Sequence, residues 1–145
     1  KIELSPCLFD SNNISTVADA IKHLPPIEDG EIHPLDPLHR SRKLSPINKA
    51  RIIATKEGGT WKDWPPKLLS GLMCRESAKG KTFTSAYARM SWDKPSPTLT
   101  THCVGLSNGR YGHPEQHRAI SLREAAILQS FPETYKFIKE GEEVN

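Results

Sequence analysis

"RAISLREAAILQSFPETYKF", residues 118–137, contains the most definite helix signal in the chain. Ser121 and Glu124 have the spacing of a capping box, in which each side chain accepts a hydrogen bond from the other residue's backbone N–H. Apolar residues then supply one broad face, namely Leu122, Ala125, Ala126 and Leu128. Phe131-Pro132 follows, and proline cannot continue a helix. The sequence therefore predicts a helix over residues 121–129.

Two β-prone segments precede this helix. "KTFTSAYARMSW", residues 81–92, and "SPTLTTHCVGL", residues 96–106, are rich in threonine and partly alternate between apolar and polar positions. Ser107-Asn108-Gly109 is suited to a turn. We predict two or three antiparallel strands within residues 82–112.

Two shorter helices are predicted nearer the start of the chain. Thr16 can cap the first, which Pro25-Pro26 ends, and Ser45 with Pro46 can begin the second, with Gly58 at its exit. Residues 27–39 read as a connector with little regular structure because prolines interrupt them. Trp61 and Trp64, beside prolines, are expected to anchor a loop. The predicted fold class is α+β, with a small twisted antiparallel sheet, long loops and about three short helices.

Charge is distributed unevenly along the chain. Residues 1–37 contain two basic and seven acidic side chains, whereas residues 38–62 contain seven basic and one acidic. Residues 63–132 again have a basic excess, and the tail from Glu133 is acidic. A basic middle between acidic ends is typical of a surface that faces a polyanion, although a solvated lysine-rich face has the same composition.

The motifs of several enzyme classes are missing from the sequence. It has no glycine-rich nucleotide loop and no G-x-S-x-G elbow. No general base stands at a suitable spacing from Cys7, so no catalytic residue is assigned.

Three widely spaced cysteines do not form a disulfide framework and indicate a reducing cytoplasm. His113 and His117 are separated by Pro114 and no C-x-x-C pair exists, so we expect no metal site. No apolar run is long enough to span a membrane. The chain does not begin with Met, so we expect it to be part of a longer protein.

Nucleic-acid binding has the strongest support from the residue pattern. Basic residues gather before and within the second predicted helix, and more lie in or beside the predicted strands. Threonine hydroxyls cluster in "TLTT", residues 98–101. Cationic side chains neutralise phosphates, and short hydroxyls fix the register on the sugar–phosphate chain. A protein-interaction domain with an acidic partner, or a His/Cys metal-binding module, fits the same pattern less well.

Residues 118–137 resemble the ninth conserved motif of DNA cytosine-5 methyltransferases, approximately R-x-L-T-x-R-E-x-A-x-L-Q-x-F-P-D-x-Y. The matching positions are Arg118, Ile120, Ser121, Arg123, Glu124, Ala126, Leu128, Gln129, Phe131, Pro132, Glu133 and Tyr135. Three of these are conservative replacements, at residues 120, 121 and 133. "TVADAIKHLPP", residues 16–26, is similar to a stretch that opens the corresponding region in the family. Thr98-Leu99 is similar to the family's Thr-Leu or Thr-Ile pair close to the backbone of the flipped nucleotide.

The resemblance implies a target recognition region over residues 1–145. Residues 1–37 would be an acidic lead-in with a short helix, and residues 38–112 a basic, variable recognition region. Residues 113–137 would hold the ninth-motif loop and helix, and residues 138–145 a linker. The family's nucleophile motif, cofactor loop and last motif are missing, and Pro6-Cys7 stands at the wrong place in the motif order. We therefore expect a monomeric, non-catalytic part of a bacterial or phage enzyme, with S-adenosylmethionine bound elsewhere in the parent.

The family reaction implies roles for individual residues. A base in a stacked duplex must be swung out before it can be methylated, so the protein must grip the remaining DNA. Thr98, with Leu99, is expected to lie at a phosphate near the flipped cytosine. Groove or flanking contacts are expected from Arg89, Thr100, Thr101, His102 and Arg110, and backbone clamps from Arg40, Arg42 and Lys43. Support of the fold is expected from Arg118, Ser121, Arg123, Glu124, Gln129, Phe131 and Pro132.

Overall fold

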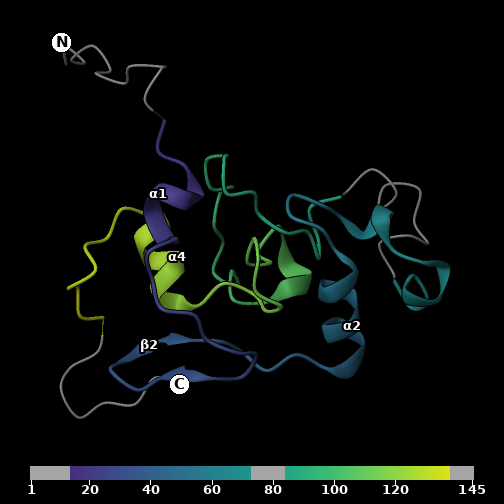
Figure 1. Ribbon diagram of the computed structural model, residues 1–145, viewed down its shortest axis with the longest axis horizontal. Helices are drawn as coiled ribbons and strands as arrows, with labels where there is room; N and C mark the ends of the chain where they lie inside the picture. The colour runs from purple at the N-terminus through teal and green to yellow at the C-terminus, as the bar shows by residue number, and fades with distance from the viewer. Residues whose placement is uncertain (1–13, 73–83, 138–145) are drawn as a thin grey trace.

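The computed structural model describes residues 14–72 and 84–137 (Figure 1). Its described α-helices are α1 (Val17–Ile21), α2 (Pro46–Ala54) and α4 (Leu122–Leu128), and its strands are β1 (Ile32–His33) and β2 (Asp36–Arg40). Short 3₁₀-helices are η1 (Trp61–Asp63), η2 (Pro66–Leu68) and η4 (Leu106–Asn108). Long loops connect these elements, which confirms the predicted α+β class. No helix among the described residues has the length and apolar character needed to cross a bilayer.

The sheet is a two-stranded antiparallel ribbon at residues 32–40, in the segment predicted to be an irregular connector. Ile32 pairs with Arg40 and His33 with Asp36, with an irregularity in register between the two pairs. Pro37 lies within β2. Both strands of a two-stranded ribbon are edges, and edge strands tolerate proline. The prolines that suggested a connector are therefore compatible with a hairpin.

The strands predicted within residues 82–112 are wrong for the described part of that segment. Residues 84–112 make only isolated bridges, Arg89 with Gly112 and Gly112 with Ala119. Their backbone groups bond to several different segments instead: Tyr87 N donates to Leu106 O and Arg89 N to Gly59 O. The β-prone composition reflects burial of small and aromatic side chains in irregular chain.

The predicted caps of the first two helices are confirmed. Thr16 and Asp19 form a capping box on α1, and the Ser45 hydroxyl accepts a hydrogen bond from Asn48 N at the start of α2. α2 ends at Ala54, before the predicted exit at Gly58, because Thr55 takes an extended conformation. Gly58 does have a positive φ of 65°, but it lies in the loop that follows.

α4 begins and ends as its sequence predicts. Ser121 and Glu124 form the reciprocal capping box. At the other end Ser130 has a left-handed φ of 66°. Its N–H donates to Ile127 O, and Phe131 N donates to Ala126 O. These two bonds are a Schellman motif, which satisfies carbonyls that a helix end leaves unpaired.

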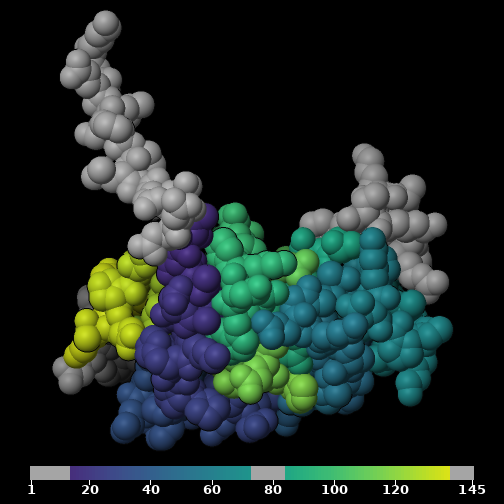
Figure 2. All heavy atoms as spheres, turned by 45° about the horizontal axis from the view of Figure 1, so that its top comes forward, coloured from purple at the N-terminus to yellow at the C-terminus, as the bar shows by residue number. Residues whose placement is uncertain are grey.

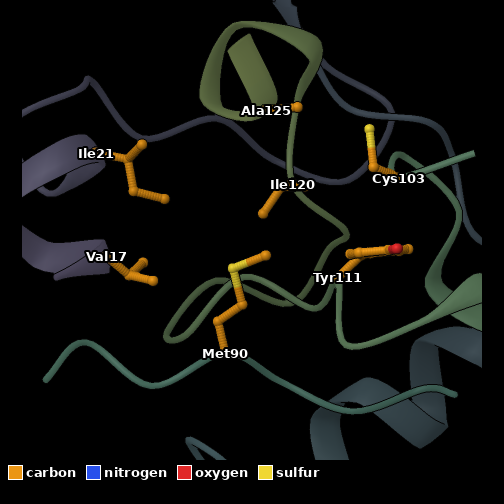
Figure 3. Packing of buried hydrophobic residues seen from close by; sticks show 7 residues of the cluster. All are labelled: Val17, Ile21, Met90, Cys103, Tyr111, Ile120 and Ala125. Carbon is orange, nitrogen blue, oxygen red and sulfur yellow. The ribbon is translucent and has the colours of Figure 1, made fainter. Parts of the chain in front are cut away.

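The main hydrophobic cluster lies between α1, α4 and the central loops (Figure 3). It contains Val17, Ile21, Met90, Cys103, Tyr111, Ile120 and Ala125. α4 also packs against β2. The helix of the quoted stretch is therefore the element on which both the hairpin and the central loops rest.

A second cluster holds the loop that follows α2. Trp61 and Trp64 are buried with Leu68 and Leu72, so the predicted tryptophan anchor is confirmed. Trp64 Nε1 donates to Thr55 Oγ1 at 2.7 Å. A third cluster of Ile52, Leu106 and Ala119 joins α2 to the centre of the molecule.

Candidate nucleic-acid interface

A surface loop at residues 98–102 carries the threonines predicted to contact DNA. Thr98, Thr100, Thr101 and His102 are exposed. Leu99 points its side chain into the main cluster, and Cys103 N donates to Thr100 O to close a turn. The central segment that carries this loop is exposed between α1 and the α2 region (Figure 2). The backbone thus presents the exposed Thr98 and Thr101 on a loop that Leu99 attaches to the main cluster.

A basic cavity of about 380 Å³ adjoins this loop. Lys94 and Arg110 line it, together with Gly58, Met90, Ser91, Pro95 and Pro97. Arg110 Nη1 donates to Gly58 O at 2.9 Å and to Arg89 O at 3.0 Å, which fixes the guanidinium at the cavity wall. Pro97 directly precedes Thr98, so positive charge and hydroxyls occupy neighbouring surface. We call this combination of the loop 98–102, Lys94 and Arg110 the threonine face.

Arg89 lies in the interior, although it was predicted to reach DNA. It is 2% exposed, and its Nε donates to Thr55 O at 2.7 Å. Its other nitrogens donate to His113 O, Gln116 O, Ile52 O and His117 Nδ1. Burial lowers the pKa of Arg89 to about 10. A guanidinium has five N–H donors, and all five are used within the protein. A DNA contact by Arg89 does not fit this geometry, and the residue instead ties the loop 113–117 to the end of α2.

The other predicted clamp residues lie at the end of the hairpin. Arg40 is half-buried in β2, and Arg42 and Lys43 are exposed in the irregular segment before α2. The hairpin runs along one edge of the molecule, whereas the start of α1 lies toward the opposite edge (Figure 1). Val17 N at that start donates to Lys94 O, so Lys94 belongs to the opposite edge. Two separate basic regions result.

Arg118 and Glu124 of the ninth-motif resemblance form a buried ion pair. Arg118 Nη1 donates to Glu124 Oε2 and Nη2 to Oε1, both at 2.7 Å, and each side chain is 1% exposed. Burial by itself would raise the pKa of Glu124, but hydrogen bonds and charge from Arg118 hold it below its usual value. Arg118 Nε also donates to Ile27 O, which joins the motif to the segment after α1. A charged pair satisfied in this way fixes chain geometry.

The remaining motif residues differ in their burial. Arg123 is buried and binds Asp36 of β2, and its Nη1 donates to Tyr135 O. Gln129 and Pro132 are exposed, and Phe131 is 37% exposed. Phe131 contacts the rings of Tyr135 and Phe137. The first half of the motif is therefore interior and the second half lies at the surface.

Sequence reasoning overlooked several buried polar residues that hold this arrangement together. His113 Nδ1 accepts hydrogen bonds from the backbone of Glu115 and Gln116, and burial lowers the His113 pKa to about 4. Because Nδ1 is an acceptor, His113 is a neutral ring with its proton on Nε2. His39 is buried against Ser121. The described residues contain no group of three or more side chains suited to a metal. Cys7 and Cys74 lie outside them.

Comparison with known proteins gives a consistent result. The family model for C-5 cytosine-specific DNA methylase matches residues 9–145. The chain is 45% identical over 141 residues to the type II methylase M.HgiDII of Herpetosiphon aurantiacus, covering 97% of this chain and 39% of that protein. It is 34% identical over 125 residues to the type II methyltransferase M.PspPI of a Psychrobacter species, covering 86% and 28%.

A eukaryotic protein is also similar. DNA (cytosine-5)-methyltransferase 3 of Arabidopsis thaliana is 33% identical over 146 residues, covering 84% of this chain and 10% of that protein. The chain thus spans less than two fifths of the length of each of these relatives. The interior Arg118–Glu124 pair, the capped helix α4 and the match over residues 9–145 lead to one conclusion. This chain belongs to the C-5 cytosine-specific DNA methylase family.

Proposed function

We propose that this chain is the part of a DNA cytosine-5 methyltransferase that recognises its double-stranded target. The observation that carries the proposal is the threonine face, where exposed hydroxyls adjoin a cavity lined by Lys94 and Arg110. In the parent enzyme a methyl group would pass from S-adenosylmethionine to carbon 5 of a flipped-out cytosine. The parent would act as a monomer in the cytoplasm and be of bacterial or phage origin; two of the relatives named above are bacterial type II enzymes.

The threonine face would contribute to the free energy of DNA binding and would take no part in the methyl transfer itself. Pulling a base from the stack costs a few kcal/mol, so contacts to the DNA left behind must offset that cost. Lys94 and Arg110 would neutralise phosphates, while the hydroxyls of Thr98 and Thr101 would fix the register on the backbone. His102 would lie toward a groove edge. Arg42 and Lys43, with Arg40 beside them, would form a second phosphate contact at the hairpin.

The catalytic nucleophile and the cofactor site are assigned to the remainder of the parent protein. The chain covers 39% of M.HgiDII, which leaves most of that relative's length for them. None of the described residues is assigned to S-adenosylmethionine. The buried residues of the motif would act as a scaffold: Arg118 and Glu124 hold the chain path, and Arg123 holds the hairpin against α4.

A binding titration tests the proposal. The purified chain is titrated against a short fluorescent DNA duplex at about 50 and 200 mM salt. Six phosphate contacts would lower affinity about a thousandfold over that range. We expect weak binding with a strong salt dependence, no methyl transfer by the chain alone, and poor competition by heparin of matched charge. Absent or salt-independent binding contradicts the proposal. Equal competition by heparin favours a general polyanion-binding or acidic-partner surface instead.

A further inference from the structure

We infer that Tyr111 is a positioning residue that sets the threonine loop in its DNA-binding shape, an inference that rests on the proposed function. The hydroxyl of Tyr111 donates to Thr98 O at 3.3 Å. It also lies 3.2 Å from Thr100 Oγ1, which can donate to it. One phenol therefore joins two residues of the loop 98–102, and neither bond depends on a DNA ligand.

The ring of Tyr111 is held firmly below this loop. Tyr111 is 3% exposed and belongs to the main cluster, where Cys103 and Ile120 are among its neighbours (Figure 3). Gly109 lies directly against it, because a Cβ there would be 2.5 Å from a ring carbon. Only glycine leaves room for the chain to pass this close to the ring. The ring is therefore closely confined, with its hydroxyl at the loop.

The backbone of Tyr111 is attached to the family motif. Ile120 N donates to Tyr111 O at 2.8 Å, and Ile120 stands two residues after the paired Arg118. Tyr111 therefore connects the interior of the motif, through its main chain, to the exposed loop, through its side chain. This connection explains how a buried ion pair could influence a surface that it does not touch.

The hydroxyl of Tyr111 matters because the loop has few other attachments. Asn108 Nδ2 donates to His102 O at 3.2 Å, and Cys103 N closes the turn at Thr100 O. The side chains of Thr98 and Thr101 have no hydrogen-bond partner among the described residues, so they remain available to phosphate. Without the Tyr111 hydroxyl, the loop 98–102 would become ordered only when DNA binds. The conformational entropy lost in that ordering would weaken binding.

The test uses the complete methyltransferase that carries this segment, with the variant Tyr111→Phe. Phenylalanine keeps the buried ring and removes the hydroxyl. We expect the Kd for a short duplex and the KM for DNA to rise about three- to tenfold, while kcat changes less than about twofold. Urea unfolding should remain a single cooperative transition. Tyr135→Phe is the matched control, since Tyr135 is 46% exposed in a different ring cluster, and it should bind as the wild type does.

A second variant separates positioning from a general effect on folding. Thr100→Val removes the partner hydroxyl from an exposed residue and should weaken binding by a similar factor. If the two hydroxyls act together, the Kd of the double variant, Tyr111→Phe with Thr100→Val, should not exceed the larger Kd of the two single variants. Folded Tyr111→Phe protein that binds as tightly as the wild type overturns the inference, as do effects that multiply in the double variant. Failure of the wild type to bind any duplex overturns the proposed function itself.

Discussion

Ser121 Oγ and His39 Nδ1 form a hydrogen bond of 2.9 Å in the interior, although the two residues are 82 positions apart. The same Ser121 oxygen accepts the N–H of Glu124, so it caps α4 and binds the hairpin at once. His39 Nε2 in turn donates to Pro25 O. The hairpin, the segment after α1 and the motif helix therefore meet at one imidazole, which explains why the capping serine is completely buried.

Glu124→Gln should destabilise the protein strongly. The substitution removes the negative charge that two Arg118 nitrogens bind, and it leaves Arg118 buried without a counter-ion. Breaking one side of a buried pair costs about 3–5 kcal/mol. The measurement is the free energy of unfolding in urea at pH 7. Glu115→Gln, at an exposed position in the preceding loop, is the control and should change it by less than about 0.5 kcal/mol. Equal stability of the two variants would contradict the assigned role of the pair.

Stability should fall between pH 7 and pH 5 because of His113. Burial lowers its pKa from 6.5 to about 4 in the folded protein, so between these values the unfolded chain takes up a proton that the folded chain does not. The contribution is complete above pH 6.5 and is lost as pH falls toward 4. Linkage gives a loss of about 2 kcal/mol between pH 7 and pH 5.

His113→Gln should remove most of this pH dependence. A smaller part should remain, because burial and the charge of Arg89 also lower the pKa of His117. The measurement is urea unfolding of both proteins at the two pH values. If the variant and the wild type lost the same free energy on acidification, His113 would not be the responsible group.

Ser130→Gly should stabilise the protein. Ser130 has a φ of 66°, in the left-handed region where a Cβ is unfavourable, and it is exposed. Glycine removes that cost but adds freedom to the unfolded chain, so the net gain should be about 0.5–1 kcal/mol. Ser130→Ala is the matched comparison, because alanine keeps the Cβ, and it should give no gain. Thermal unfolding monitored by circular dichroism measures both, and a lower midpoint for the glycine variant would contradict the expectation.

Lys94→Gln should reduce the salt dependence of DNA binding. The substitution removes one charge from the cavity of the threonine face. Each lost phosphate contact lowers the slope of log K against log salt by about 1. Titration of the duplex at four or more salt concentrations measures this slope. Lys67→Gln, at an exposed residue of η2, is the control and should leave the slope unchanged. Equal slopes for the two variants would contradict the assignment of Lys94 to a phosphate contact.

Local signals allowed the sequence to predict the helices but not the sheet. The caps at Thr16, Ser45 and Ser121 each depend on residues within one turn of the helix, so the local sequence is enough to predict where each helix begins. The hairpin depends on contacts of Leu38 and His39 with distant segments, and its prolines concealed it. Alternation near residue 88 predicted strands, yet those residues are buried on all sides and pair with three different loops.

The candidate site shows the same division. The exposure of Thr98 and Thr100 agrees with the DNA contacts that the family resemblance implied, whereas the position of Arg89 did not follow from its sequence neighbours. An arginine among small apolar residues can reach solvent or satisfy interior carbonyls, and only the fold decides between them. The signal that could have helped was composition: Ala86, Ala88 and Met90 around Arg89 are residues typical of an interior.

Residues 90–94 are attached to their surroundings by main-chain groups: Met90 N bonds to Gly112 O, while Trp92 O and Lys94 O accept from Ala18 and Val17. Such attachments are indifferent to side-chain identity, except that a Cβ at Gly112 would meet Ile52. An exposed position such as Asp93 can therefore change over evolutionary time while the path of the segment is preserved, whereas Met90 is also held by its side chain in the main cluster.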